Sequence, residues 1–249
     1  MAIEHKFLNH DFGNGFATKN AILSTVPYDP EVFILGTYNP VSPNNQFVDF
    51  FYGRNWFWTI FANYFIHNAT HLIQKRAVTD FTQPTLEEIF RLCKKLKLSF
   101  SDLIGQTLHH QNPNYQFVPI NKVQFNGNVY SLIDDNGLAA LNNIDQVDWN
   151  TQNIVKYLIE TPSIKTVYFT RKPTGVWQMQ WNILTNHPQL QHISFSNIHT
   201  PSGMGLAEAG VPISHSLAKR WIVNPAAGIG VLNNAWLELH GVNLTNFLY

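Results

Sequence analysis

Short apolar runs alternate along this chain with longer stretches in which apolar residues recur at helical spacing. The runs at residues 32–35, 164–170 and 191–197 predict strands, and the first is apolar throughout, as in a strand buried on both faces. Helical spacing predicts helices over residues 54–68, 84–98, 151–162, 174–186 and 231–241. Helices that alternate with short strands indicate an α/β fold with a parallel sheet.

The chain shows no sign of division into separate parts. No internal repeat or low-complexity linker interrupts it, so we expect a single domain over residues 1–249. The helix over 84–98 has a clear start, because a proline and a threonine open it and two glutamates occupy its first turn. Residues 107–150 are rich in Asn, Gln and His, and we expect long loops or a small hairpin around residues 123–132.

Composition sets bounds on the class of protein. Apolar residues make up 45% of the 249 residues and aromatic residues 14%, which is ample for a packed core. The formal net charge is zero, so the overall charge gives no support for a nucleic-acid partner, although a local basic patch would suffice. Cys93 is the only cysteine, which excludes an internal disulfide and a thiolate metal cluster. Without a long apolar run or a signal-peptide core, we expect a soluble, cytoplasmic protein with no membrane partner.

Polar turns follow the three predicted strands. They are GTYNP at 36–40, TRKPTG at 170–175 and NIHTPSG at 197–203. In open α/β sheets, ligands bind beyond the carboxyl ends of the strands, so we expect these turns to meet around a site. Gly36 and Gly203 would allow a ligand to approach the backbone closely. Each turn taken singly is an ordinary chain reversal, and it is their meeting at one edge that favours a function.

Five segments stand out in chain order: ILGTYNPVSP, FFYGRNWFW, FSDLIGQT, TVYFTRKPTGVW and HTPSGMG. Together they resemble the motifs of the uracil-DNA glycosylase superfamily, and most closely those of its mismatch-specific and hypoxanthine-type branches. The resemblance covers residues 30–207 and leaves 208–249 as a C-terminal extension. It implies a three-layer α/β/α sandwich around a central, mostly parallel four-stranded sheet.

The resemblance also implies an activity. Enzymes of this superfamily flip a base out of DNA and hydrolyse its N-glycosidic bond, because the bond is shielded while the base is stacked. They need no metal and no cofactor. No lysine occupies the motifs as a Schiff-base nucleophile, Lys172 being the nearest exception, so we expect a monofunctional DNA glycosylase that acts as a monomer on DNA.

Three residues are candidates for the catalytic positions that the resemblance implies. Asn39 would position the attacking water, although an Asx turn before a proline is an equally ordinary role for it. Asn55 would hold water and base through its amide, or simply cap the following helix. His199 would stabilise charge on the departing base if its loop is shifted, since Thr200 occupies the usual position; otherwise it is a surface histidine.

The remaining candidates fall into two groups. The resemblance places around the base Gly36, Thr37, Tyr38, Phe51, Tyr52 and Thr170, and for the aromatic residues plain core packing is the alternative. Residues that it implies for DNA contact are Arg171, Lys172, Thr200, Pro201, Ser202, Gly203 and Met204. Ser202 would contact a phosphate, and Met204 would insert into the duplex as an apolar wedge. For the Arg-Lys pair, a solvated turn is the alternative. The adjacent His109 and His110 lack a third partner in the sequence, which argues against a metal site.

The departures from the family motifs concern the substrate. An enzyme that recognises uracil normally uses an amide side chain to bind the edge of the pyrimidine, whereas this sequence has Thr170 and Arg171 at the end of its second predicted strand. Hypoxanthine, a modified pyrimidine and a hypermodified base of viral DNA therefore stay open, and the last would make this a phage-defence enzyme. Two rival functions also stay open. One is a non-catalytic module that binds a modified base or nucleotide, and the other is a hydrolase of free nucleosides.

Overall fold

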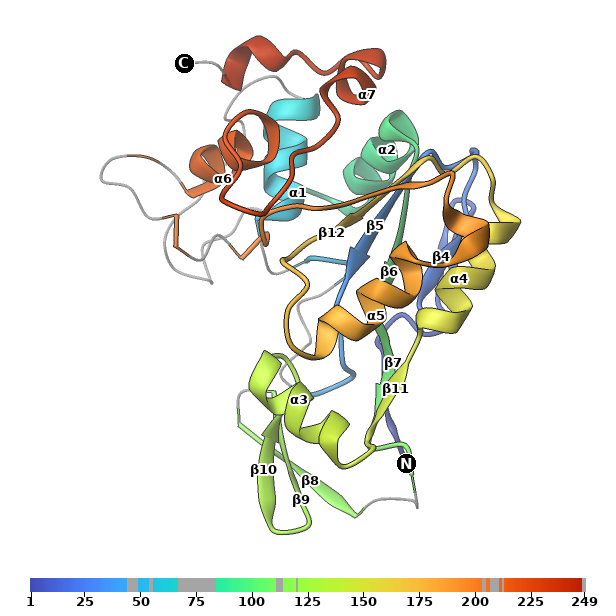
Figure 1. The fold of residues 1–249 in the computed structure, drawn as a ribbon, viewed down its shortest axis with the longest axis vertical. Coiled ribbons are helices and arrows are strands. Elements are labelled where there is room, and N and C mark those ends of the chain that lie inside the picture. The colour runs from blue at the N-terminus through green and yellow to red at the C-terminus, as the bar shows by residue number, and fades with distance from the viewer. Residues whose placement is uncertain are drawn as a thin grey trace.

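The computed structural model describes residues 1–43, 49–53, 56–66, 84–110, 114–119, 121–202, 205–206, 211 and 213–247. Its main element is a seven-stranded mixed sheet (Figure 1). Four neighbouring strands of this sheet run parallel, in the order β13 (Ser194–Asn197), β12 (Thr166–Phe169), β5 (Val32–Gly36) and β6 (Leu98–Asp102). Three antiparallel strands extend it beyond β6, namely β4 (Ile22–Thr25), β3 (Phe16–Lys19) and β2 (Asp11–Gly13).

Two further three-stranded antiparallel sheets complete the strands of the described chain. One has the order β1 (Ile3–Glu4), β7 (Ile104–Thr107) and β11 (Val147–Trp149), and the other β10 (Asn128–Ser131), β9 (Lys122–Phe125) and β8 (Tyr115–Val118). The hairpin expected around 123–132 is therefore confirmed as β9 and β10. It turns at Asn126 and Gly127, which both have positive φ, as a tight hairpin requires.

The expectation of a sandwich around a central four-stranded sheet is wrong, because the main sheet has seven strands and mixed direction and two more sheets accompany it. The difference begins with residues 11–25, which form the antiparallel meander β2–β3–β4. Its first turn places Asn14 and Gly15 at φ of 53° and 80°, the positive values of an Asn-Gly hairpin turn. These strands have only three or four residues each, too few to show a clear periodicity.

The five predicted helices all contain helical structure. The first comprises α1 (Phe57–Ile60) and a π-helical segment, Phe61–Ile66. The others are α2 (Leu86–Leu96), α4 (Thr151–Glu160), α5 (Val176–Thr185) and α7 (Asn234–Leu239). The helix start predicted at Thr85 is confirmed, and Thr85 and Glu88 form a capping box there. The sequence did not predict α3 (Asp135–Asn143), α6 (Ile213–Ile222) or the 3-10 turns Pro188–Leu190 and Leu244–Phe247.

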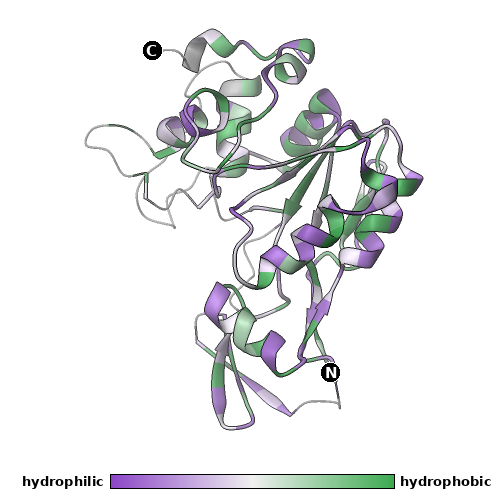
Figure 2. Cartoon of the chain, viewed as in Figure 1, coloured by the Kyte–Doolittle hydropathy of each residue, from purple (hydrophilic) through white to green (hydrophobic). Residues whose placement is uncertain are grey.

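Helices cover both faces of the parallel strands, because the side chains of β5 point alternately to the two sides. Val32 and Ile34 pack with α1, α2, α6 and α7, whereas Phe33 and Leu35 pack with α4 and α5. Figure 2 shows hydrophobic strands in this half of the sheet and hydrophilic residues on the outward faces of the covering helices. In the described part of the chain, none of the helices combines the length and the apolar character needed to cross a membrane.

Candidate active site at the carboxyl ends of the parallel strands

The turns that follow the parallel strands meet at one edge of the sheet. The N–H of Thr170 donates to the carbonyl of Leu35 at 3.0 Å, and the N–H of Ile198 donates to Phe169 at 2.8 Å. The segment before α1 joins the same edge, because the N–H of Trp56 donates to the carbonyl of Pro201 at 3.0 Å. The expected meeting of the turns is therefore present in the structure.

A buried carboxylate lies at the centre of this edge. Asp102 ends β6 and is 2% exposed. Its Oδ2 accepts a hydrogen bond from Nε2 of His5 at 2.8 Å and another from Nδ2 of Asn39 at 2.6 Å. A buried charge needs such partners, because an unpaired carboxylate would be costly to remove from water. Among the described side chains, both of these hydrogen bonds go to Oδ2.

The N-terminal segment brings His5 to the carboxylate. The N–H of His5 donates to the carbonyl of Gly105 at 2.8 Å, and the N–H of Lys6 donates to the carbonyl of Asn39 at 2.7 Å. The N–H of Phe7 also donates to Nδ1 of His5 at 3.0 Å. Because a backbone N–H can only donate, Nδ1 carries no proton, and the ring proton therefore sits on Nε2, facing Asp102.

Gly36 leaves room for the side chains at the site. A Cβ on Gly36 would lie 2.1 Å from Oδ1 of Asp102 and 2.7 Å from the hydroxyl of Tyr52, distances that no real Cβ tolerates. Only glycine fits between these two oxygens in their present positions. The glycine that the sequence singled out for close approach to a ligand is thus closely approached by side chains of the chain itself.

Tyr52 adopts a backbone conformation that is rare for a bulky residue, with φ of +63°. Its ring stacks on Phe57 at 4.5 Å between centroids, and its hydroxyl lies 3.0 Å from Oγ1 of Thr170. Burial raises the pKa of the Tyr52 phenol well above its usual value, and the charge of Asp102 raises it further, while the bond to Thr170 lowers it in part. The phenol therefore stays protonated at neutral pH.

Four of the predicted residues lie together around Asp102, namely Gly36, Asn39, Tyr52 and Thr170. The other residues that were expected to contact the base have structural roles instead. The hydroxyl of Tyr38 donates to the carbonyl of Ile3 at 2.6 Å, which attaches β1 to this part of the fold. Phe51 is fully buried. Its ring packs against those of Phe7, Phe50, Phe100 and His5. Thr37 is half-buried, and its carbonyl accepts from the N–H of Ile104 at 3.0 Å.

The last turn contributes mainly backbone groups. The carbonyl of His199 accepts from Nε1 of Trp221 at 2.7 Å, and the imidazole is half-buried. Pro201 is buried, while Ser202 is exposed with its hydroxyl 3.4 Å from that of Thr200. Three predicted residues, Asn55, Gly203 and Met204, lie outside the described residues.

Arg171 is engaged within the protein. Its Nη1 donates to Oδ1 of Asp135 at 2.6 Å, its Nη2 bonds Oδ2 of the same carboxylate, and its guanidinium lies 4.9 Å from the ring of Trp177. Partial burial acts to raise the pKa of Asp135, but the hydrogen bonds and charge of Arg171 outweigh it and lower that pKa below its usual value. The pair attaches α3 to the turn after β12. Lys172 is exposed, beside Gly228.

His109 and His110 are not part of a metal-binding cluster in the described part of the chain. The rings of His109 and His110 lie 3.8 Å apart, and His110 lies 3.2 Å from Asp145. Burial lowers the pKa of His109, and the neighbouring His110 lowers it further. Among the described residues, no three His, Cys, Asp or Glu side chains come together as metal ligands.

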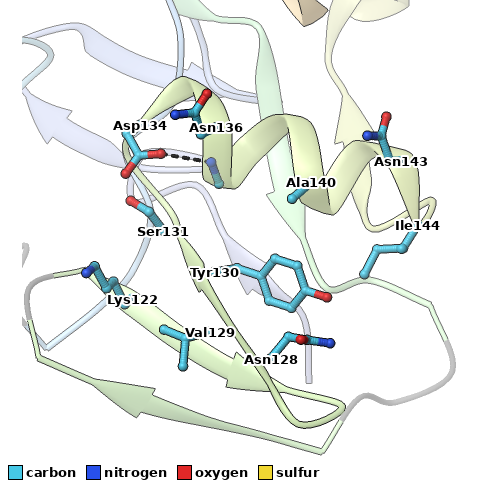
Figure 3. A pocket seen from close by; sticks show the side chains of 11 residues that line it. Lys122, Asn128, Val129, Tyr130, Ser131, Asp134, Asn136, Ala140, Asn143 and Ile144 are labelled. Carbon is cyan, nitrogen blue, oxygen red and sulfur yellow. Dashed lines mark hydrogen bonds between the residues drawn. The ribbon is translucent and has the colours of Figure 1, made fainter.

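A separate open groove of about 740 Å³ lies between α3 and the β9–β10 hairpin (Figure 3). Its lining includes Lys122, Val129, Tyr130 and Ile144, and Asp134 caps α3 beside it by accepting from the N–H of Gly137 at 2.8 Å. The groove shares no lining residue with the site around Asp102.

The sequence offered only a weak signal for the two central residues, His5 and Asp102. Neither residue was predicted as a site residue, and the one signal that could have indicated Asp102 is its charge within the largely apolar segment LSFSDLIG. Nothing local indicates that His5 bonds to it. No protein-family model matches this chain, and neither a curated protein nor a solved structure matches it.

Proposed function

We propose that this protein is a monofunctional DNA glycosylase, which hydrolyses the N-glycosidic bond of a base flipped out of DNA. The observation that carries the proposal is the buried carboxylate of Asp102, held by His5 and Asn39 where the strand turns meet. The order of the sequence motifs that resemble the uracil-DNA glycosylase superfamily supports the same activity.

The chemistry needs negative charge near the sugar and an oriented water. Cleavage of an N-glycosidic bond develops positive charge on the sugar ring, which a nearby carboxylate stabilises. Nδ2 of Asn39 donates one of its N–H groups to Asp102, and the amide oxygen of Asn39 can accept a hydrogen bond from water. The water oxygen bonds to C1′ of the sugar, the C1′–N bond breaks, and the base leaves with the bonding electron pair. The proton lost by the water passes to solvent, and solvent protonates the base.

The proposed DNA contacts come from the exposed turns at the same edge. Lys172 and Ser202 are exposed there, and we assign them to phosphates of the DNA backbone. Arg171 is left out of this set, because its ion pair with Asp135 already occupies the guanidinium.

Base release from a panel of oligonucleotides tests the activity. Each oligonucleotide would carry one altered or natural base, and mass spectrometry would identify any base set free. We expect Asp102→Asn to slow release at least a hundred-fold, because it removes the charge with little change of shape. Asp148→Asn is the matched control, since this carboxylate is exposed and accepts from the side chain of Gln106 at 2.9 Å. Release from no oligonucleotide, or unchanged release by Asp102→Asn, contradicts the proposal.

One observation favours a second candidate, a module of this architecture that binds a modified base without cutting it. The oxygens of Tyr52 and Asp102 occupy the space beside Gly36, and Phe51 is committed to the core. Such a module would bind one oligonucleotide of the panel tightly and release no base from it, and Asn39→Ala would leave that binding intact.

A further inference from the structure

We propose that the groove between α3 and the β9–β10 hairpin binds an extended peptide segment of a partner protein, which adds to the free edge of β10 as a further strand. The groove shares no lining residue with the site around Asp102, so its role is independent of the proposed glycosylase activity. Strand addition of this kind takes its affinity from main-chain hydrogen bonds and its specificity from contacts with alternate side chains.

The main chain of β10 turns hydrogen-bonding groups toward the groove. Phe125 and Asn128 flank the two-residue turn and bond to each other, so the next residue, Val129, points its N–H and carbonyl away from β9. The contact with α3 agrees with this alternation. A Cβ on Gly137 would lie 2.2 Å from the carbonyl oxygen and 2.6 Å from the nitrogen of Ser131, so these two groups face α3. Main-chain groups two residues apart in a strand point to the same side, and those of Val129 therefore face the groove.

The edge of β10 is open at Val129. In the described part of the chain, neither its N–H nor its carbonyl has a hydrogen-bond partner. The close approach of Gly137 covers the edge at Ser131, whereas Val129 lines the groove and is 56% exposed. Unpaired edge groups are a template for pairing with another chain. An extended peptide residue placed opposite Val129 would satisfy both of them.

The opposite wall of the groove leaves space for the side chains of such a peptide (Figure 3). It includes Gly137, Ala140 and Ile144, which recur at helical spacing and therefore lie on one face of the helical segment. The first two are small. Ile144 is 42% exposed, and Val129 on the facing strand is more exposed still. An aliphatic side chain of the peptide would bury this apolar surface.

Both walls of the groove are attached to the body of the protein. Asp135 in α3 bonds Arg171 and accepts from Nε1 of Trp177 at 3.1 Å. The hairpin is held through Asn121, whose side-chain oxygen accepts from the hydroxyl of Ser42 at 2.6 Å. A groove with walls fixed in this way loses less conformational entropy when it binds a ligand.

The charge of the groove favours a peptide over a nucleic acid. Among the described residues that line it, Lys122 is the only cation, and Asp134 offsets its charge. A nucleic-acid strand needs several cations for its phosphates, whereas the main chain of a peptide is uncharged. The amides of Asn136 and Asn143 add donors and acceptors suited to peptide groups.

A library of short random peptides displayed on phage tests the proposal with the 249-residue chain as the target. We expect enrichment of peptides that contain an aliphatic residue, and we expect the same sequences to bind as synthetic peptides. Amide hydrogen exchange locates the contact, and exchange of the Val129 N–H should slow at least ten-fold when the peptide is bound. Enrichment of no peptide, or binding that leaves exchange at Val129 unchanged, overturns the proposal.

Proline substitutions separate the two edges of the sheet. Val129→Pro removes the outward N–H but no bond to β9, because proline is tolerated where the N–H of an edge strand faces away from its neighbour. We expect this variant to bind the selected peptides at least ten-fold more weakly. Phe117→Pro is the matched control, since the register places its N–H on the opposite edge, that of β8. Equal binding by folded Val129→Pro and the wild type, or equal weakening by both variants, contradicts the assignment.

Two further variants complete the test. If Val129→Pro does not fold, Ala140→Phe fills the groove from α3 and should weaken peptide binding by at least the same factor; unchanged binding overturns the proposal. A single-stranded oligonucleotide of mixed sequence is the competing probe, and Lys122→Gln should leave its binding unchanged. Oligonucleotide binding that falls ten-fold in Lys122→Gln, together with no enriched peptide, would assign the groove to nucleic acid instead.

Discussion

His5 and Asp102 are 97 positions apart in the sequence, yet Nε2 of His5 lies 2.8 Å from Oδ2 of Asp102 in the interior of the protein. The contact joins the N-terminal segment to the end of a central strand. It also connects stability with activity, because the same imidazole satisfies a buried charge and orients the carboxylate proposed to act on the substrate.

Replacing His5 is expected to weaken both properties. His5→Phe keeps a ring but leaves Oδ2 of Asp102 with one partner fewer, and loss of a hydrogen bond to a charged group costs about 1.5–3 kcal/mol. His5→Gln provides an amide donor and should recover part of the loss in unfolding free energy and in base release. Urea titration and base-release assays measure the two effects. His192→Asn, at an exposed position, is the control. Equal stability of His5→Phe and the wild type would contradict the assigned bond.

Adding one methyl group at Gly36 is expected to disturb the site directly. Gly36→Ala forces a Cβ against Oδ1 of Asp102 and the hydroxyl of Tyr52, and overpacking of this kind costs about 1–3 kcal/mol. Gly105→Ala is the matched control, because a Cβ there meets only an ordinary contact at 3.8 Å. Thermal unfolding compares the two variants. A Gly36→Ala protein as stable as Gly105→Ala would show that the two oxygens move aside at little cost.

The ion pair between Asp135 and Arg171 should stabilise the fold at neutral pH and lose this effect in acid. The folded protein holds the pKa of Asp135 below the value of about 3.9 for a free aspartate. The stabilisation is therefore complete above that unfolded value and is lost as the pH falls through the lower folded value. Asp135→Asn should be less stable than the wild type at pH 7, and the difference should shrink below about pH 4. Urea midpoints at both pH values check this, with Asp29→Asn as the control. A difference that stays constant over this range would contradict the role of the pair.

Buried tyrosines should make the fold sensitive to alkali. Burial raises the pKa values of Tyr28 and Tyr38, and it raises that of Tyr168 to about 12. Their contribution is complete below the unfolded value of about 10 and is lost as the pH rises further, because the unfolded chain ionises first. Tyr28→Phe removes one such group, together with its bond to the carbonyl of Leu98 at 2.6 Å. The wild type should be the more stable at pH 8 and should lose that advantage toward pH 11, as followed by circular dichroism.

The sequence predicted the local structure better than the assembly. The apolar run at 32–35 and the capped helix at 84–98 carry strong periodic signals, and both elements are present. The meander over 11–25 was missed because its strands are very short, although the Asn-Gly pair at 14–15 marked its turn. The expected number of strands was wrong for this reason, since only a tertiary contact, the pairing of β4 with β6, adds the meander to the sheet.

In the candidate site, too, the local features were predictable from the sequence and the long-range contacts were not. Gly36 ends β5, and Asn39 and Thr170 lie in the turns after β5 and β12, so the rule that ligands bind at strand ends was enough to single out these turns. The pairing of His5 with Asp102 depends on long-range packing that no local pattern encodes. The ion pair of Arg171 could not be predicted either. An arginine in a turn looks the same in the sequence whether its side chain is solvated or, as here, bonded to a carboxylate.

The lack of space for a Cβ at position 36 limits which side chains can occur together around this site. While the carboxylate of Asp102 and the phenol of Tyr52 keep their present positions, only glycine fits at position 36, and any larger residue there requires at least one of the two oxygens to move. The three positions are therefore coupled sterically, and the effect of a change at any one of them depends on the other two.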